Sequence, residues 1–555
     1  LSSSSAASDV YKRQGQDFVS CSENISLVKK VYDPHDIIDC SHLPSQLLKE
    51  CSWDDAVKAI IKGQMETRGP VTCPGLSEVL GIEEAHITAA LATLEVEGSI
   101  LSGSFSNQNL EEKEWCERRL LARIHRLTIE GLRQQIKPVP RSQFMKFLIT
   151  HQHAGSDSML MDESGTLRIL QMLMAFEAPC SAWESEFLSS RIRSYQAQWL
   201  DQLCFNGVIS WGRLKPPPRK EAQKGKGSLL SKMMPVSIFP RTHLGWLLPK
   251  DRDHHEEQLS HDGSKVYLCI KELGAPFFED ICQQVRLPKA AVEDALGELV
   301  SLGLAAADGF EAIRPLIAPD RKRKSQIKRR SRRQIIFETG FQRGGRWSAF
   351  PGNTNPSSDD DAIENWAWLL LERYGLIFKD LLVREKLAPQ WRDLVRVYRR
   401  LEMRGEIRGG RFVHGVAGEQ FALAESIEKL RSVKKHHSPW RIFSACDPLN
   451  FAGTLDDHPK VPAVPGNRVV YEDGELVAYR EAGEIQFLKE FDGDTREIIQ
   501  RAIRLNGSFR YRDPFIRDYH ESKKQEPALQ TEEDNGSKDG PSHLNWSQIT
   551  GIQHK

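Results

Sequence analysis

A unit of about thirty residues recurs along the chain, and this repetition constrains the fold more than any single motif does. In each copy a short helix precedes a longer amphipathic helix, which ends at a glycine before an apolar, β-branched segment. The stretch from Gly69 to Gly98 matches the stretch from Gly274 to Gly303 without a gap, at an offset of 205 residues (274 − 69). Looser copies begin at Ala178 and Gly375. The sequence therefore predicts four modules with the same supersecondary structure.

Each module has the pattern of a winged helix. In the first copy, Ile87, Leu91 and Leu94 follow the three-to-four spacing that places side chains on one face of a helix. Gly98 predicts the end of that helix, because glycine adopts the left-handed conformation at low cost. The second helix of a helix-turn-helix commonly enters a DNA groove, although such modules also serve as spacers or protein contacts. Four modules in tandem favour a track for nucleic acid.

Composition limits how the chain can hold a nucleic acid. The 555 residues include 76 basic and 76 acidic side chains, so a purely electrostatic grip by the whole surface is excluded. A local basic footprint lies at residues 321–333, where nine Lys or Arg occur without an acid. This run predicts a solvated linker, and such a linker can still neutralise phosphates. The ten cysteines form no CxxC pair and no apolar run is long enough to cross a bilayer, which indicates a reduced, cytoplasmic protein.

Histidine pairs at 151/153, 254/255 and 436/437 lack the partners of a zinc site, so we predict no metal. The arginines of EWCERRLLARIH at 114–125 favour a packing strut between modules, with DNA contact secondary. Composition shifts divide the chain as follows: an artefactual or disordered leader at 1–14, a linker at 15–52, a winged helix at 53–110, a helical connector at 111–160, a winged helix at 161–213, a flexible linker at 214–235, a winged helix at 236–318, a basic linker at 319–333, β-barrel strands at 334–360, a winged helix at 361–432, a β-barrel with a closing helix at 433–505, and a disordered tail at 506–555.

Several long strings resemble one protein family in the same order along the chain. They are EWCERRLLARIH at 114–125, GGRWS at 344–348, YRRLEMRGEIRGGRF at 398–412, DPLNFAGTL at 447–455 and VPAVPGNRVVY at 461–471. Together they resemble the C-terminal region of bacterial large helicase-related (Lhr) proteins, from about Trp53 to Leu488. The resemblance implies an α+β fold: tandem winged-helix domains and a small C-terminal β-barrel similar to a class of winged-helix DNA glycosylases, with barrel strands also near 334–350.

The same resemblance implies two RecA-like motor lobes upstream of this region. The chain has no GxxxxGK[ST] loop and no DEAD or DEAH box, so we expect ATP and magnesium to act only in the absent motor and no cofactor to bind here. We favour a DNA-binding accessory region of a DNA-repair helicase, acting on single-stranded or forked DNA beside the helicase core. Two alternatives stay open: a monofunctional DNA glycosylase for uracil or a damaged base, and a homo-oligomerisation scaffold.

Two groups of residues are candidates for DNA contact. In QRGGRWS, Arg343, Arg346 and Trp347 combine guanidinium groups with an indole that could stack on an unpaired base, although Trp347 could instead fill a core. The second group surrounds the last helix and wing of the fourth module, where a solvated charged face is the alternative interpretation. It consists of Arg399, Arg400, Arg404, Arg408 and Arg411.

Glycosylase chemistry requires a carboxylate or amide that orients water at the sugar carbon. Four residues in segments similar to barrel strands are candidates for this role: Asp447, Asp473, Glu419 and Gln420. Each of these residue types also serves in turns and helix caps, so turn or cap positions are the alternative.

Overall fold

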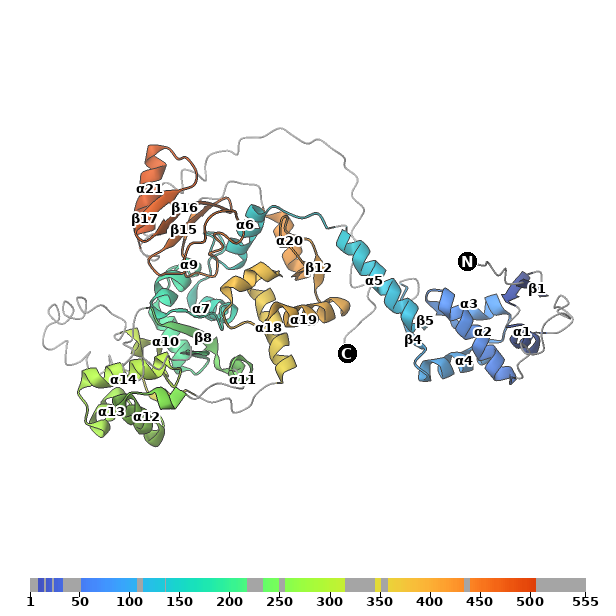
Figure 1. The fold of residues 1–555 in the computed structure, drawn as a ribbon, viewed down its shortest axis with the longest axis horizontal. Coiled ribbons are helices and arrows are strands. Elements are labelled where there is room, and N and C mark those ends of the chain that lie inside the picture. Colours follow the sequence, from blue (N-terminus) through green and yellow to red (C-terminus); the bar gives the residue numbers. More distant parts are fainter. Residues whose placement is uncertain are drawn as a thin grey trace. The chain divides into compact units, whose positions relative to one another are not determined.

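The computed structural model describes residues 8–13, 16–21, 24–32, 51–106, 113–134, 136–216, 233–248, 255–314, 345–350, 358–433 and 440–505. The described residues before position 135 form one compact unit, and those from 136 onward form a second. Figure 1 shows the helices and strands of both units along the chain. Because the two units are separate bodies, we describe each by itself.

The first unit contains one winged helix preceded by a hairpin. Its elements are β1 (Ser8–Arg13), β2 (Gln16–Cys21), α1 (Ile25–Val31), α2 (Trp53–Thr67), β3 (Val71–Thr72), α3 (Cys73–Leu80), α4 (Glu84–Val96), β4 (Ile100–Gly103), β5 (Glu114–Glu117) and α5 (Arg118–Gln134). The predicted leader and linker therefore contain structure. Strands β1 and β2 pair Val10 with Val19 and Tyr11 with Phe18, and such β-branched and aromatic residues favour strands.

Local sequence explains where the helices of the first module begin. The Ser52 hydroxyl accepts a hydrogen bond from the Asp55 amide at the start of α2, and Thr72 caps α3 in the same way through Gly75. Ile87, Leu91 and Leu94 of α4 are fully buried, as the apolar spacing predicted. These contacts place the opposite face of α4 in solvent.

The second module lies in the second unit, after α6 (Arg141–His151). Its elements are α7 (Asp162–Met172), β6 (Ala178–Pro179), α8 (Cys180–Ala182), the π-helical turn η4 (Trp183–Leu188), α9 (Ser189–Arg191), α10 (Ala197–Phe205), β7 (Ile209–Gly212) and β8 (Pro235–Pro240). Strand β8 pairs with both β6 and β7. The predicted boundaries at 213 and 235 therefore differ from the structure, because the strand that completes this sheet follows residues 214–232.

The third module follows α11 (Leu244–Leu247). It contains α12 (His261–Leu273), α13 (Phe278–Val285), α14 (Lys289–Ser301), β9 (Ala305–Ala307) and β10 (Trp347–Ala349). Helices α13 and α14 have the bounds of α3 and α4 shifted by 205 residues (278 − 73 and 289 − 84), which is the offset found in the sequence. Strand β10 pairs with β9. The segment near 334–350 was predicted to contribute barrel strands, and this is wrong for β10, which completes a winged helix.

The fourth module contains α18 (Asp359–Tyr374), β11 (Leu376–Ile377), the 3-10 helix η9 (Lys379–Arg384), α19 (Trp391–Met403), β12 (Arg408–Gly410), β13 (Gln420–Ala422) and α20 (Ala424–Ser432). The sheets of the first, second and fourth modules have the same strand order, with the last strand in the centre: β3-β5-β4, β6-β8-β7 and β11-β13-β12. In all four modules the glycine that ends the longer helix has a positive φ, between 66° and 78°, at Gly98, Gly207, Gly303 and Gly405. The repeat thus predicted the common architecture.

The C-terminal element is an open sheet rather than a barrel. Its strands β14 (Arg441–Ser444), β15 (Arg468–Glu472), β16 (Glu475–Glu481) and β17 (Glu484–Phe487) pair in sequence order, and α21 (Gly493–Arg504) follows them. No closed sheet occurs among the described residues. Alternate residues explain this difference: Ile442 and Val470 pack in a cluster with Ile499 of α21, whereas Phe443 and Val469 join the main core of the second unit. Both faces of the sheet are therefore covered, although the sheet does not close into a barrel.

A candidate nucleic-acid interface on the fourth module

Helix α19 occupies the position of the recognition helix in the fourth module. Its apolar face, with Leu394, Tyr398 and Leu401, is fully buried against the module core. On the other side the side chains of Arg392 and Arg396 are 75% and 81% exposed. Their ion pairs with Asp393 are long, at 3.5 and 3.8 Å, so the helix presents these two guanidinium groups to solvent. The sequence analysis missed both residues, although their four-residue spacing was visible.

Three of the predicted arginines are engaged with carboxylates. Arg399 binds Glu419 through two hydrogen bonds of 3.2 and 2.8 Å. Arg400 and Arg404 both bind Glu364 of α18, at 2.6 and 3.0 Å. Each of these arginines is nevertheless about half exposed or more. Phosphates would have to compete with the carboxylates, so Arg392 and Arg396 are the better placed pair.

The wing contributes one exposed and one half-buried arginine. Arg411 follows β12 and is exposed, whereas Arg408 lies within β12 and is half-buried. Burial lowers the pKa of Arg408, with the Glu402 carboxylate opposing that shift. Arg411 therefore adds an exposed guanidinium group to the wing, whereas Arg408 is partly enclosed within it.

The other three recognition helices lack such a basic face. Helices α4 and α10 contain no lysine or arginine, and α14 contains only Lys289, in its first turn. The second half of α14 is also buried, from Ala295 to Val300. Four winged helices of similar construction thus differ in surface charge, and the arginine surface belongs to the fourth.

The predicted GGRWS group is divided between the core and the surface. Trp347 is 2% exposed and packs in the core shared by the second and third modules, so its indole is not available for stacking. Arg346 is exposed, and its guanidinium lies 5.3 Å from the ring centroid of Phe277. Phe277 is 44% exposed, and the sequence analysis missed it. Arg343 and the basic run at 321–333 lie outside the described residues.

Asp447 is part of a buried polar network. Its carboxylate accepts two hydrogen bonds from Arg191, at 2.7 and 2.8 Å, and one from the Leu449 amide at 2.9 Å. Arg191 also donates to the Gln152 side chain at 3.1 Å. Both members of the ion pair are at most 1% exposed. This geometry joins the second module to the C-terminal sheet and leaves Asp447 no open path to a substrate.

The other three predicted catalytic candidates also have structural partners. Gln420 is 1% exposed and binds the Phe412 and Val413 amides at 2.9 Å, which closes the wing. Glu419 is held by Arg399. Asp473 lies in the β15–β16 turn, 2.7 Å from Lys146. Glu419 and Gln420 are neighbours at the start of β13, whereas Asp447 and Asp473 lie on other segments with partners of their own, so the four candidates do not form one site.

Glu177, which was not predicted from the sequence, has a raised pKa. Burial raises the pKa of Glu177, and the Arg213 guanidinium opposes that shift. Its Oε1 has no hydrogen-bond partner among the described residues. Nothing in the spacing of the sequence marked Glu177, because it stands alone before β6.

Within the described ranges, no group of three or more His, Cys, Asp or Glu is placed to hold a metal ion. Among the same residues, no helix has the length and hydropathy of a membrane span.

Comparisons with known proteins identify the second and fourth modules. Two family models, both described as a winged-helix domain of the large helicase-related protein, match residues 139–229 and 356–441. A DNA glycosylase of Streptomyces sahachiroi, AlkZ, gives a TM-score of 0.39 at 10% identity, over 67% of this chain and 97% of that protein.

Two curated relatives extend the match over most of the chain. The Lhr helicase/probable uracil glycosylase of Mycolicibacterium smegmatis is 28% identical over 458 residues, which cover 78% of this chain and 29% of that protein. The Lhr helicase/uracil glycosylase of Escherichia coli is 24% identical over 457 residues, which cover 74% and 28%. The chain thus spans less than a third of the length of these relatives. It is a C-terminal region related to the large helicase-related proteins, with winged-helix domains of that family.

Proposed function

We propose that this chain is the DNA-binding C-terminal region of an Lhr-type DNA-repair helicase in the cytoplasm. In this proposal it holds single-stranded or forked DNA beside motor lobes that bind ATP and magnesium outside the chain. The exposed arginine surface of the fourth module, made of Arg392, Arg396 and Arg411 with Arg399 beside them, carries the proposal. Guanidinium groups on a recognition helix are suited to phosphate contact, because each can donate several hydrogen bonds in a fixed plane.

The test is a titration of labelled single-stranded and forked DNA by fluorescence anisotropy over a series of salt concentrations. Arg392→Ala/Arg396→Ala is expected to weaken binding to both DNAs. It should also lower the slope of log K against log salt by about 1.4 on single strands, because each phosphate contact contributes about 0.7. The double variant Lys429→Ala/Arg431→Ala is the matched control. It removes two positive charges from α20 of the same module.

The control is expected to bind DNA as the unchanged chain does. Equal binding by the α19 variant and the unchanged chain would refute the proposal. Equal weakening by both double variants would also refute it, because the effect would then come from total charge rather than from α19.

Uracil glycosylase activity is a second candidate, favoured by the names of both relatives, which include uracil glycosylase. The measurement is strand cleavage of a uracil-containing oligonucleotide after incubation with the chain and then with alkali. Asp473→Asn and Glu419→Gln should leave any activity in place, because these carboxylates are occupied by Lys146 and Arg399. Cleavage equal to that of a thymine control would remove this candidate.

A further inference from the structure

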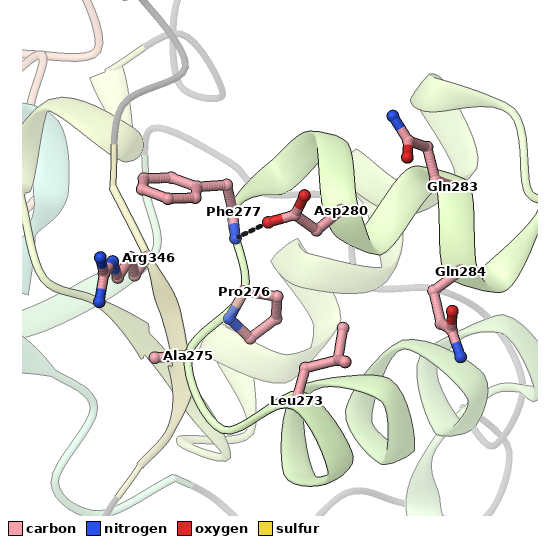
Figure 2. A pocket seen from close by; sticks show the side chains of 8 residues that line it. All are labelled: Leu273, Ala275, Pro276, Phe277, Asp280, Gln283, Gln284 and Arg346. Carbon is pink, nitrogen blue, oxygen red and sulfur yellow. Dashed lines mark hydrogen bonds between the residues drawn. The ribbon is translucent and has the colours of Figure 1, made fainter.

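A groove of about 500 Å³ lies on the third module, away from the arginine surface of α19. It is bounded by the end of α12, the start of α13 and the strand segment before β10, as Figure 2 shows. Its lining side chains are Leu273, Ala275, Pro276, Phe277, Asp280, Gln283, Gln284 and Arg346. We call it the Phe277 groove.

The groove brings an aromatic ring and a guanidinium group together beside the apolar side chain of Leu273. Leu273 and Phe277 are 49% and 44% exposed, so both side chains are accessible to a ligand. The Arg346 guanidinium lies 5.3 Å from the centroid of the Phe277 ring. This distance is within the range of a cation–π interaction. A flat ligand can therefore meet an aromatic face and a positive charge together.

Backbone contacts hold these two side chains in place. Phe277 and Arg346 face each other in an antiparallel bridge. The Phe277 amide donates to Asp280 at 3.0 Å, and the Arg346 amide donates to Asp308 at 2.7 Å. These main-chain hydrogen bonds fix the positions of Phe277 and Arg346, so the groove is formed without a ligand.

The polar groups of the groove are suited to a nucleobase. Gln283 and Gln284 line it, and both residues are exposed. Each amide offers one acceptor and two donors, the complement that base edges require. The single positive charge of Arg346 is balanced by Asp280, which disfavours a long run of phosphates in the groove. One base with one neighbouring phosphate matches this charge.

We propose that the Phe277 groove binds one unpaired nucleobase of a DNA strand. The base stacks on the Phe277 ring, an adjacent phosphate meets Arg346, and Gln283 or Gln284, at the other end of α13, binds a neighbouring nucleotide. The proposal rests on the proposed function in one respect, since the chain must bind DNA. It assigns a separate contact to a different module, and its residues are distinct from the arginines of α19.

The first test uses the full chain and an oligothymidylate with one 5-iododeoxyuridine, irradiated and then mapped by mass spectrometry. The expected result is a cross-link within residues 275–284. Cross-links confined to α19 and the wing, with none within residues 275–284, would overturn the inference while leaving the proposed function intact. If an apolar peptide binds in the groove and DNA does not cross-link there, the ligand of the groove is a protein. That result would also overturn the inference.

The second test compares affinities for single-stranded DNA. Phe277→Ala is expected to lower affinity at least about fivefold, whereas Phe277→Trp retains it because stacking remains. Leu268→Ala is the matched control, since Leu268 is a large apolar side chain of α12 that is 57% exposed outside the groove. Arg346→Ala should weaken binding more than Lys265→Ala on α12 does. Unchanged affinity in both Phe277→Ala and Arg346→Ala would contradict the inference, and absence of DNA binding by the unchanged chain would overturn both proposals.

Discussion

At the residue scale, ion pairs in this protein fall into two classes with different roles. The Arg191–Asp447 pair is almost fully buried and has two parallel hydrogen bonds, whereas the Arg399–Glu419 pair is 62% and 32% exposed. Breaking a buried ion pair leaves an unpaired charge in the interior, which is costly. The members of an exposed pair can instead interact with water and ions when the pair separates. Asp447 therefore belongs to the fold, and the exposed arginines are available to other ligands.

Replacing Asp447 by alanine should destabilise the second unit by about 3–5 kcal/mol, because it leaves the Arg191 charge buried and unpaired. Urea unfolding followed by circular dichroism measures this change. Glu372→Ala is the control, since the Arg168–Glu372 pair is 54% and 37% exposed and should contribute about 0–1 kcal/mol. Similar losses in the two variants would contradict the assignment of Asp447 to a structural role.

His151 gives a prediction for the dependence of stability on pH. Burial lowers the pKa of His151 below 6.5, so the folded chain keeps the imidazole neutral while the unfolded chain accepts a proton. The stability that depends on the neutral ring is present above pH 6.5 and is lost as the pH falls below that value. The urea concentration at the midpoint of unfolding should therefore decrease as the pH is lowered from 7.5 to 5.5. The His151→Gln variant should show a smaller decrease. An equal decrease in both proteins would contradict this prediction.

Sequence pattern identified some of the candidate contact residues and missed others for physical reasons. Arg399, Arg400 and Arg404 were visible as a cluster, and helical phase could also have identified Arg392 and Arg396. Phe277 could not be predicted, because a phenylalanine beside a helix is expected to be buried. Trp347 was ambiguous for the same reason, and its burial depends on the pairing of β10 with β9 across forty residues (347 − 307).

At the element scale, the repeat predicted helices well and strands poorly. Helices α13 and α14 reproduce the bounds of α3 and α4 at the offset found in the sequence. Strands β3, β6 and β11 have two residues each, too few for a recognisable alternation. The barrel expectation was wrong because alternating apolar residues show that both faces of a sheet are covered, but not whether its edges meet.

The β15–β16 hairpin tests how the C-terminal sheet packs on α6. Gly474 has a φ of +80°, and a Cβ at this position would lie 2.0 Å from the Ser142 carbonyl oxygen. Gly483, in the β16–β17 turn, has a φ of +96° and open space around its Cβ position. Gly483→Ala should lower the free energy of unfolding by about 1–2 kcal/mol through backbone strain alone.

Gly474→Ala combines the same strain with a clash against the α6 backbone, so its loss of stability should be clearly larger. Thermal unfolding of the two variants measures the difference. Equal losses would mean that the hairpin does not pack closely on α6.

At the scale of the whole molecule, the zero net charge is compatible with the proposed DNA binding because exposed positive charge is concentrated on one module. The second unit joins its modules through buried contacts: Arg373 of α18 donates to the Met172 carbonyl at 2.9 Å, and Arg468 of β15 binds Glu186 at 2.8 Å. These contacts use arginines in the interior. The exposed recognition-helix arginines are those of α19, so one of four similar modules carries the surface on which the proposed function depends.

A charge scan of the four recognition helices tests this account most directly. Each substitution lowers the net charge by one at an exposed position: Ala89→Glu in α4, Gln202→Glu in α10, Ala290→Glu in α14 and Arg396→Gln in α19. We predict that Arg396→Gln alone weakens binding of single-stranded DNA and lowers its salt dependence in anisotropy titrations. Equal weakening by all four substitutions, or weakening by any of the first three without an effect at Arg396, would contradict the account.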